Sequence, residues 1–281
     1  MQISNDLSNR LGKGKISDPL SVAVVERDRD VLLMVHNALR EKRAILAYQP
    51  VVQAARTDRP AFYEGLIRIQ DPTGRIIPAK DFIDVVEHTK MGRAIDCLAL
   101  ELGLQSLHEE PALRLSINMS ALSIDFDRWV RTLNHGLKAD PTIAERLILE
   151  ITERSAMVMP SKVQEFMESY QQHGVCFALD DFGSGYTALR YLKEFHFDIL
   201  KIDGQFINDV HKNPDNLALT KAIISIARHF DMFTVAEHVE NELDAAILTE
   251  IGADCLQGYL FGAPTVRPYW QQKRDAPLRT G

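Results

Sequence analysis

The chain has 281 residues, of which 46% are hydrophobic and 25% are charged, and this suits one (β/α)₈ domain or two smaller domains. Its formal net charge of −7 argues against broad binding to nucleic acid polymers. No apolar run approaches the length of a membrane span, and the N-terminus lacks the apolar region of a signal peptide. The odd number of cysteines, three, indicates free thiols, so we predict a cytoplasmic protein.

In chain order, we expect a flexible lead-in over residues 1–26, one domain over 27–268 and a polar, mobile tail over 269–281. An amphipathic helix is predicted over Arg27–Arg43, after which strands and helices alternate, as in a parallel sheet. The predicted strands are Ile45–Val52, Phe62–Ile69, Leu113–Asn118, Leu147–Glu150, Val175–Asp180, Ile199–Asp203, Phe233–Glu237 and Cys255–Leu260. The later predicted helices are Asp81–Thr89, Arg93–His108, Ser161–His173, Tyr186–Glu194, Asn216–Phe230 and Asn241–Ile251.

Polar side chains lie at or near the ends of most predicted strands. A barrel of parallel strands gathers its strand ends on one face, where catalytic residues converge. We therefore expect side chains that are far apart in the sequence to meet around one centre. They are Gln49, Glu64, Asn118, Glu150, Asp180, Asp181, Lys201, Glu237, Glu240 and Gln257.

Asp180 ends the apolar run Val175–Leu179 and is followed at once by Asp181. Adjacent carboxylates at the end of a buried strand are costly unless they are protonated or neutralised by a cation. Glu64 and Glu150 share the strand-end location, and oxygen ligands without His or Cys indicate Mg²⁺ or Mn²⁺. Each acid taken singly is also compatible with a plainer role, such as capping the following helix.

The segment Gly183–Ala188 follows a strand and satisfies the pattern G-x-G-x-x-A, with the acid Asp203 further on. This is the fingerprint of dinucleotide binding. Asp180 and Asp181 would repel a pyrophosphate unless a metal intervened, and the segment lies late in the series of strands rather than in a first βα turn. An NAD-binding dehydrogenase is therefore a remote alternative.

A series of short motifs between Ile45 and Pro264 resembles the EAL-domain cyclic di-GMP phosphodiesterases, and the motifs occur in family order. They are Tyr48-Gln49-Pro50, Glu64-Gly65-Leu66-Ile67-Arg68, Ile117-Asn118-Met119-Ser120, Leu149-Glu150-Ile151-Thr152-Glu153, Leu179-Asp180-Asp181-Phe182-Gly183-Ser184-Gly185-Tyr186, Leu200-Lys201-Ile202-Asp203, Ala236-Glu237-His238-Val239-Glu240 and Gln257-Gly258-Tyr259. The resemblance implies a (β/α)₈ TIM-like barrel whose first strand runs antiparallel to the rest. It also implies an enzyme that cuts one phosphodiester of cyclic di-GMP to give linear pGpG.

The same resemblance implies a two-metal site and a role for each matching residue. One ion would be held by Glu64, Asn118, Glu150 and Asp180, and the second by Asp180, Asp181 and Glu237. Lys201 would contact the attacking water and the scissile phosphate. Glu240 would orient a water or the ligand, and Glu153 would anchor the loop after Asp181. The residues that would hold the ligand are Gln49, Arg68 and Gln257.

Three departures from the family pattern stand close to these residues. The signature Glu-Ala-Leu is Glu64-Gly65-Leu66, a usual glycine is His238, and a usual Arg-Ser pair is Gly204-Gln205. No proposed metal ligand is missing, so an active enzyme is favoured. A catalytically silent cyclic di-GMP receptor, or an interaction protein on the same fold, is the alternative. The resemblance also implies a homodimer, and a regulatory protein partner is a further expectation.

Overall fold

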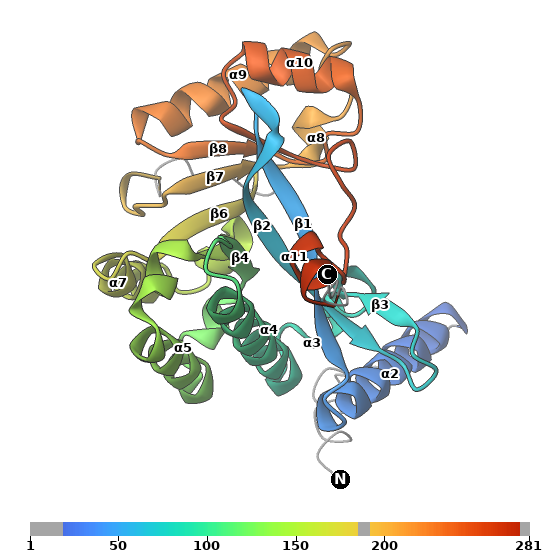
Figure 1. The fold of residues 1–281 in the computed structure, drawn as a ribbon. Coiled ribbons are helices and arrows are strands. Elements are labelled where there is room, and N and C mark those ends of the chain that lie inside the picture. The colour runs from blue at the N-terminus through green and yellow to red at the C-terminus, as the bar shows by residue number, and fades with distance from the viewer. Residues whose placement is uncertain (1–18, 185–191, 276–281) are drawn as a thin grey trace, which may run out of the picture.

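The computed structural model describes residues 19–184 and 192–275, and within them nine strands form one sheet (Figure 1). The sheet closes into a barrel because β1 pairs with β2 as well as with β9, while β3 is added to the outer edge of β2. β1 is antiparallel to both neighbours, and the strand pairs from β2 through β4 to β9 are parallel. The predicted barrel with an antiparallel first strand is therefore confirmed. The strands are β1 Ala44–Gln53, β2 Arg56–Gln70, β3 Ile76–Pro78, β4 Leu115–Asn118, β5 Leu147–Thr152, β6 Cys176–Phe182, β7 Ile199–Ile202, β8 Phe233–Ala236 and β9 Cys255–Gln257.

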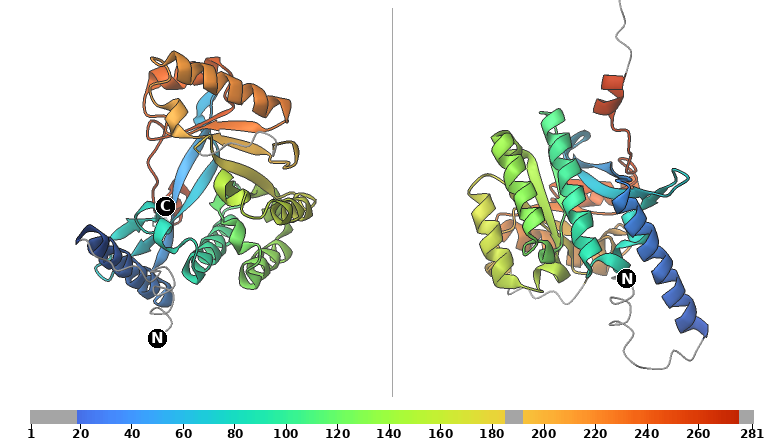
Figure 2. Two further views of the ribbon diagram at one scale, coloured as in Figure 1. Left: turned by 180° about the vertical axis from the view of Figure 1, so that it is seen from behind. Right: turned by 90° about the horizontal axis from the view of Figure 1, so that it is seen from below.

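Helices cover the outside of the barrel, where α4, α5 and α7 lie side by side (Figure 2). The ring of Trp129 on α5 packs at 5.8 Å from that of Phe166 on α7. No helix within the described ranges is long and apolar enough to cross a membrane. The helices are α2 Pro19–Arg40, α3 Ile83–Val86, α4 Lys90–Glu109, α5 Asp127–Ala139, α6 Glu153–Ala156, α7 Pro160–Gln171, α8 Gly204–Ile207, α9 Pro214–His229, α10 Glu242–Glu250 and α11 Tyr269–Asp275.

Capping residues determine where several of these helices begin. Thr89, Asn213 and Asn241 are the N-caps of α4, α9 and α10, and each side chain accepts a hydrogen bond from a backbone N–H of the first turn. Such a bond satisfies a donor that has no partner within the helix. Pro160 and Pro214 stand at the start of α7 and α9, where proline costs no hydrogen bond.

The interior of the barrel is apolar at one level and polar at the next. A buried apolar cluster fills it, formed by Val51, Phe62, Ile148, Ala178, Ile199 and Val235. Alternate residues of a strand point to the same face, so the residue two positions further along each parallel strand also points inward. Those residues are Glu64, Glu150, Asp180, Lys201 and Glu237. The apolar cluster is therefore the floor of the polar site.

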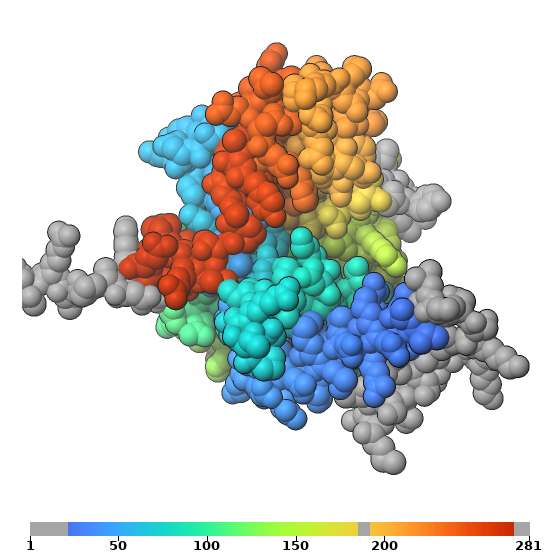
Figure 3. Space-filling view, turned by 90° about the vertical axis from the view of Figure 1, so that its right-hand side faces the viewer, coloured from blue at the N-terminus to red at the C-terminus, as the bar shows by residue number. Residues whose placement is uncertain are grey.

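The N-terminal helix starts before its predicted position. α2 begins at Pro19, so the prediction of a flexible lead-in is wrong from that residue onward. Val35 and Ala38 of α2 are buried in a separate cluster with Ile69 and Phe82. Figure 3 shows α2, in blue, lying along the turquoise segment that contains β3 and α3. Burial of this apolar stripe stabilises the C-terminal half of α2, whereas Val22 and Val24 near its N-terminus are exposed.

Four described helices were not predicted: the one-turn helices α6 and α8, and the longer α5 and α11. α5 buries Trp129 completely. α11 lies in the stretch expected to be a mobile tail, and Trp270 is only 4% exposed there. The Trp270 ring packs edge-on against the rings of Tyr48 and Tyr63, at 5.2 and 4.8 Å. The tail prediction is therefore wrong for α11, and the predicted helix Tyr186–Glu194 lies mostly outside the described residues.

Cys97, Cys176 and Cys255 are free, as their odd number predicts. Burial raises the pKa of each thiol, and that of Cys255 to about 11. Because the thiolate is the reactive form, we assign these cysteines to packing.

Asp96 on α4 ties this outer helix to the turn that follows β4. Its Oδ2 accepts hydrogen bonds from the Ser120 N–H at 2.9 Å and from the Ser123 hydroxyl at 2.6 Å. Burial raises the pKa of the carboxyl to about 6, although these two hydrogen bonds act in the opposite direction. The folded state therefore holds a proton that the unfolded state releases near pH 4. The free energy of unfolding should fall as the pH rises from about 4 to 6.

Replacing Asp96 by asparagine should remove this dependence. The amide oxygen can accept both hydrogen bonds without carrying a charge. Since the Asp96 residue keeps some solvent contact, we expect Asp96→Asn to raise the free energy of unfolding at pH 7 by about 1–2 kcal/mol. Urea denaturation at pH 5 and pH 7 measures the free energy of unfolding of both proteins. A variant that is less stable than the natural chain at pH 7 would contradict the prediction.

Candidate metal and substrate site

Lys201 occupies the centre of the barrel at the carboxyl ends of the strands. Its side chain is 1% exposed, and its Nζ lies 2.8 Å from Glu150, 2.9 Å from Asp180 and 2.9 Å from Glu237. A fourth carboxylate, that of Glu64, is 3.5 Å away. These four acids come from β2, β5, β6 and the end of β8. The structure thus brings together residues that the sequence places far apart.

The amide side chains of the predicted site gather around Glu64. Oε1 of Glu64 accepts a hydrogen bond from Asn118 Nδ2 at 2.8 Å, and its Oε2 accepts one from Gln257 Nε2 at 2.6 Å. Gln257 Nε2 also lies 3.2 Å from Gln49 Oε1. Gln49 in turn donates to the carbonyl of Gly262 at 3.1 Å. Gln49, Gln257 and Asn118 therefore share one wall of the site with Glu64.

A second group of acids lies beside the first. One carboxylate oxygen each from Asp180, Asp181 and Glu237 lies within 4.8 Å of the others. Asp181 adopts the left-handed region, with φ of 54°, which is uncommon for a residue other than glycine. β6 and β7 change register between Leu179 and Phe182, so both neighbouring acids, Asp180 and Asp181, face this group.

Burial, with added repulsion between neighbouring carboxylates, raises the pKa values of several acids in this site. Burial raises the pKa of Glu150 to about 8, and the charges of Glu64 and Asp180 add to that effect. Burial and the neighbouring carboxylates also raise the pKa of Glu237 well above its usual range. Burial, with the charge of Asp180, raises the pKa of Asp181 to about 6. Without cations, part of this site is therefore protonated at neutral pH.

Lys201 and Glu64 show the opposite balance. Burial alone would lower the pKa of the Lys201 ammonium, but the surrounding carboxylates, Asp180 first, raise it well above its usual value. Burial alone would raise the pKa of Glu64, but Lys201 and the hydrogen bonds from Gln257 and Asn118 hold it below its usual value. Lys201 is therefore charged, and it faces an ionised Glu64.

The donor set fits divalent cations. Four carboxyl groups surround the Lys201 ammonium and a fifth, that of Asp181, lies beside them, and within the described ranges no histidine or cysteine joins this group. The five acids are Glu64, Glu150, Asp180, Asp181 and Glu237. Oε1 of Glu150 is buried and has no hydrogen-bond partner among the described residues. A buried carboxylate oxygen without a partner is costly, and a hard cation that prefers oxygen ligands would satisfy it.

Three other predicted residues lie around this centre. Glu153 begins α6, is 6% exposed and accepts a hydrogen bond from the Gly183 N–H at 3.3 Å. Arg68 stands on β2 beyond Glu64; burial lowers the pKa of its guanidinium, and the charge of Glu64 opposes that change. Glu240 is exposed, and within the described ranges it makes no hydrogen bond or ion pair. The structure thus gathers Glu153 and Arg68 near the acids but leaves Glu240 at the surface.

Sequence reasoning missed two side chains that contact this region. Gln205 donates a hydrogen bond from Nε2 to the carbonyl of Gly183 at 2.9 Å. Asp96 supports the turn directly after Asn118. Asp96 could have been noticed in the sequence, because it is an acid within an apolar helical stretch. Gln205 stood out in the sequence only as a departure from the family pattern, and its contact with Gly183 was not predicted, because that partner lies on another strand-end loop.

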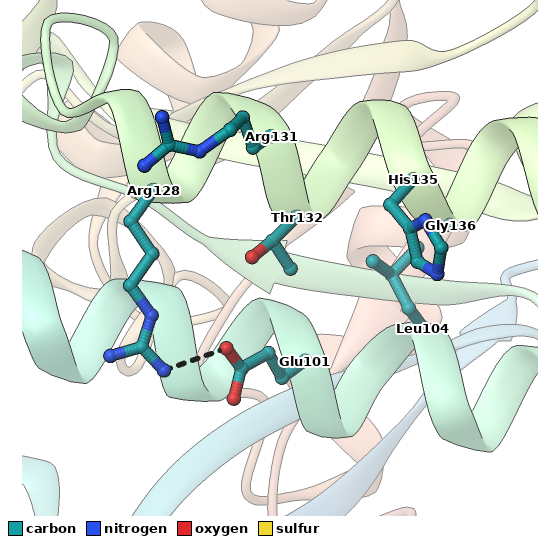
Figure 4. A pocket seen from close by; sticks show the side chains of 7 residues that line it. All are labelled: Glu101, Leu104, Arg128, Arg131, Thr132, His135 and Gly136. Carbon is teal, nitrogen blue, oxygen red and sulfur yellow. Dashed lines mark hydrogen bonds and ion pairs between the residues drawn. The ribbon is translucent and has the colours of Figure 1, made fainter.

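A surface groove lies elsewhere, on the outer helices α4 and α5 (Figure 4). Arg128 and Arg131 line it together with Thr132 and His135, and Arg128 bridges to Glu101 at 2.9 Å. None of these residues lies at a strand end. The groove is therefore separate from the acidic site.

The chain matches the EAL domain family over residues 33–264. It belongs to the EAL domain family. It is 32% identical over 234 residues to the cyclic di-GMP phosphodiesterase PdeF of Escherichia coli, which covers 82% of this chain and 31% of PdeF. It is also 32% identical over 237 residues to the cyclic di-GMP phosphodiesterase PdeB of Shewanella oneidensis, which covers 82% of this chain and 27% of PdeB.

A solved structure of the phosphodiesterase PaMucR in complex with c-di-GMP resembles this EAL domain with a TM-score of 0.77 at 30% identity. The match covers 86% of this chain and 99% of that one. An EAL domain protein of Listeria monocytogenes matches with a TM-score of 0.76 at 27% identity, covering 86% and 96%. The chain spans about a third of the length of the curated relatives that it matches.

The closed barrel does not support the alternative of an NAD-binding dehydrogenase. That function needs an open sheet with a crevice where the strand order reverses. Here β6, which precedes the glycine segment, is paired on both sides within a closed barrel. Asp203 is the N-cap of α8 and accepts a hydrogen bond from the Gln205 N–H at 2.8 Å. Gly185, the second glycine of the segment, lies outside the described residues.

Proposed function

We propose that this EAL domain hydrolyses cyclic di-GMP to linear pGpG with Mg²⁺ or Mn²⁺, and so lowers the concentration of this second messenger. One observation carries the proposal: Lys201 is buried among acids from four separate strands, at the face where barrel enzymes hold their catalytic residues. The named phosphodiesterases among the relatives support it.

The residues divide into two ion-binding sets that share Asp180. Glu64, Asn118, Glu150 and Asp180 would hold one ion, and Asp180, Asp181 and Glu237 would hold the second. When bound, two such cations neutralise a phosphodiester and lower the pKa of a coordinated water. Asn118 is a neutral ligand, so it moderates the negative charge of the cage.

The other residues would bind and orient the substrate. The Lys201 ammonium, already held by three carboxylates within 3 Å, would face the attacking water and the phosphate, where negative charge develops. Arg68 has a planar guanidinium that suits a phosphate or a guanine edge. The amides of Gln49 and Gln257 would hold the ligand beside Glu64. Glu240 would orient a water or the ligand from the rim.

A product assay tests this function directly. Purified protein with Mg²⁺ or Mn²⁺ should convert cyclic di-GMP to pGpG, as resolved by chromatography. Binding of the nucleotide without pGpG would identify a silent receptor. Neither binding nor turnover would indicate an interaction protein. The homodimer and the regulatory partner stay predictions, which sedimentation and affinity capture would address.

Glu153 should control the loop after Asp181 without binding substrate. Glu153→Ala removes the acceptor of the Gly183 N–H, so the position of Asp181 would no longer be held. We expect a folded variant that loses most turnover and that needs a higher Mg²⁺ concentration to reach half of its maximal rate. Turnover measured across a range of Mg²⁺ concentrations checks this. Near-normal rates throughout would show that Glu153 has only a local structural role.

A further inference from the structure

Both backbone polar groups of Gly183 are hydrogen-bonded to side chains. Its N–H donates to Glu153 at 3.3 Å, and its carbonyl accepts from Gln205 Nε2 at 2.9 Å. Gly183 has a φ of 94°, and a Cβ there would lie 2.4 Å from the ring of Phe206. Only glycine fits this position. The chain just after Asp181 is thus fixed against the segment that follows β7.

Gln205 is itself well placed to hold another loop. Its N–H donates to Asp203 Oδ1 at 2.8 Å, and its carbonyl accepts from Asn216 Nδ2 at 3.0 Å. The backbone of Gln205 is therefore anchored to β7 on one side and to α9 on the other. Its side chain reaches Gly183 from a fixed base.

The preceding residue, Gly204, makes a second contact with a ligand-bearing segment. A Cβ at Gly204 would lie 2.7 Å from Cγ and Cδ2 of His238 and 2.8 Å from its Cβ. His238 directly follows Glu237 and adopts the left-handed region, with φ of 55°. This conformation is energetically unfavourable for a residue with a Cβ, so it persists only where surrounding contacts hold it. The close approach of the Gly204 backbone to the imidazole supplies such a contact.

Backbone hydrogen bonds hold the same segment on either side of His238. The Glu237 N–H donates to the Ile202 carbonyl at 3.2 Å, and the Val239 N–H donates to the Gln257 carbonyl at 2.9 Å. The imidazole against Gly204 is thus the side-chain part of a short, well-fixed segment. Two of the departures from the family pattern, Gly204-Gln205 and His238, meet here in space.

We propose that Asp203–Gln205 is a bracket that positions two acids of the second ion-binding set, Asp181 through Gly183 and Glu237 through His238. The proposal rests on the proposed function, because it concerns the same ions. Gln205 and His238 are positioning residues, since each acts through a neighbour of a ligand. Gly204 has no side chain because the imidazole of His238 takes that space.

Removal of the Gln205 amide tests the first arm of the bracket. One lost hydrogen bond corresponds to a change of roughly 5–10-fold in an equilibrium constant. Gln205→Ala should weaken binding of the second Mn²⁺ by that factor and leave the first ion unchanged, as measured by electron paramagnetic resonance titration of free Mn²⁺. Asn208→Ala is the matched control, because that exposed side chain makes no hydrogen bond among the described residues. Equal weakening of both ions, or none, would overturn this arm.

A double-mutant cycle tests the second arm. Gly204→Ala should weaken the second Mn²⁺ by about tenfold when His238 is present and by less than about twofold in the His238→Gly background, because coupling between contacting residues is of this size. An equal loss of Mn²⁺ affinity in both backgrounds would show that Gly204 is needed for the structure of α8 and not for contact with His238. Thermal denaturation of each variant without metal identifies any variant that fails to fold. If a Gly204 or His238 variant does not fold, the result for Gln205→Ala tests the proposal.

The same titration separates this proposal from the proposed function. If the natural chain binds two Mn²⁺ ions and the Gln205 and Gly204 variants match it, the bracket is wrong and the ion sites stand. If the natural chain binds no Mn²⁺, the proposed function and the bracket both fail.

Discussion

Replacing Lys201 by methionine is expected to abolish turnover and to destabilise the metal-free protein by about 3 kcal/mol at pH 8. Methionine keeps much of the volume and removes the ammonium that now lies within 3.5 Å of four carboxylates. Those acids would then face one another without a cation. The loss is therefore electrostatic, and it should depend on pH and on metal.

The sign of the pH dependence follows from the carboxyl pKa values. In the natural chain burial already raises the pKa of Glu150 to about 8, and removing Lys201 raises such values further. The folded variant then binds more protons than the unfolded chain above about pH 4, so its free energy of unfolding falls as the pH rises. Lys201→Met should cost less at pH 5 than at pH 8.

Urea denaturation in EDTA at both pH values measures this difference. Addition of Mn²⁺ should stabilise the variant more than the natural chain, because the ions replace the missing charge. Lys162→Met is the matched control, since the Lys162 side chain is 54% exposed and surface ion pairs contribute little. A cost that is independent of pH and of Mn²⁺ would assign Lys201 to packing alone.

The barrel was predictable because its pattern is local and repeated. Each strand is a short apolar run, and the two-residue period places Glu150 above Ile148 and Asp180 above Ala178 on the same face. Parallel pairing then gathers the ends at one level; Asn118 pairs with Glu150, for example. Local periodicity and the rule for strand ends were enough to predict most of the residues that meet, with Glu240 as an exception.

The elements that were missed depend on contacts with distant parts of the chain. Trp270 defines α11 because it packs on Tyr48 and Tyr63, which are remote in the sequence. The apolar residues at the start of α2, such as Val22 and Val24, are exposed, so burial against the barrel does not mark Pro19 as the start of the helix. Likewise, no local pattern predicts that His238 approaches Gly204. Such pairings require the folded backbone.

The position of each acid within the site was less predictable than its presence. Glu240 shares a motif with Glu237, yet Glu237 contacts Lys201 at 2.9 Å and Glu240 is exposed. The left-handed residue His238 separates them and turns the chain outward after β8. A spacing of three residues therefore does not ensure that both acids face one centre.

Asp180→Asn is expected to reduce turnover by about 10³-fold or more, on the order of 4 kcal/mol of transition-state stabilisation. Asp180 is the residue that the two proposed ion-binding sets share. Its Oδ1 lies 2.9 Å from Lys201, and a carboxylate oxygen of Asp180 lies within 4.8 Å of those of Asp181 and Glu237. Removing its charge should weaken both ions at once, so excess metal should not restore the rate.

Asp181→Asn provides the contrast, because Asp181 belongs to the second set alone. Its turnover should fall at low Mn²⁺ and recover in part at high Mn²⁺, whereas that of Asp180→Asn should stay low throughout. Asp198→Asn is the matched control: this acid precedes β7 at the opposite end of the barrel, where its Oδ2 accepts the Phe177 N–H at 2.8 Å. It should keep full turnover, since an amide oxygen can accept the same bond. Recovery of Asp180→Asn at high Mn²⁺ would show that Asp180 serves one ion only and would replace the shared ligand by two independent sites.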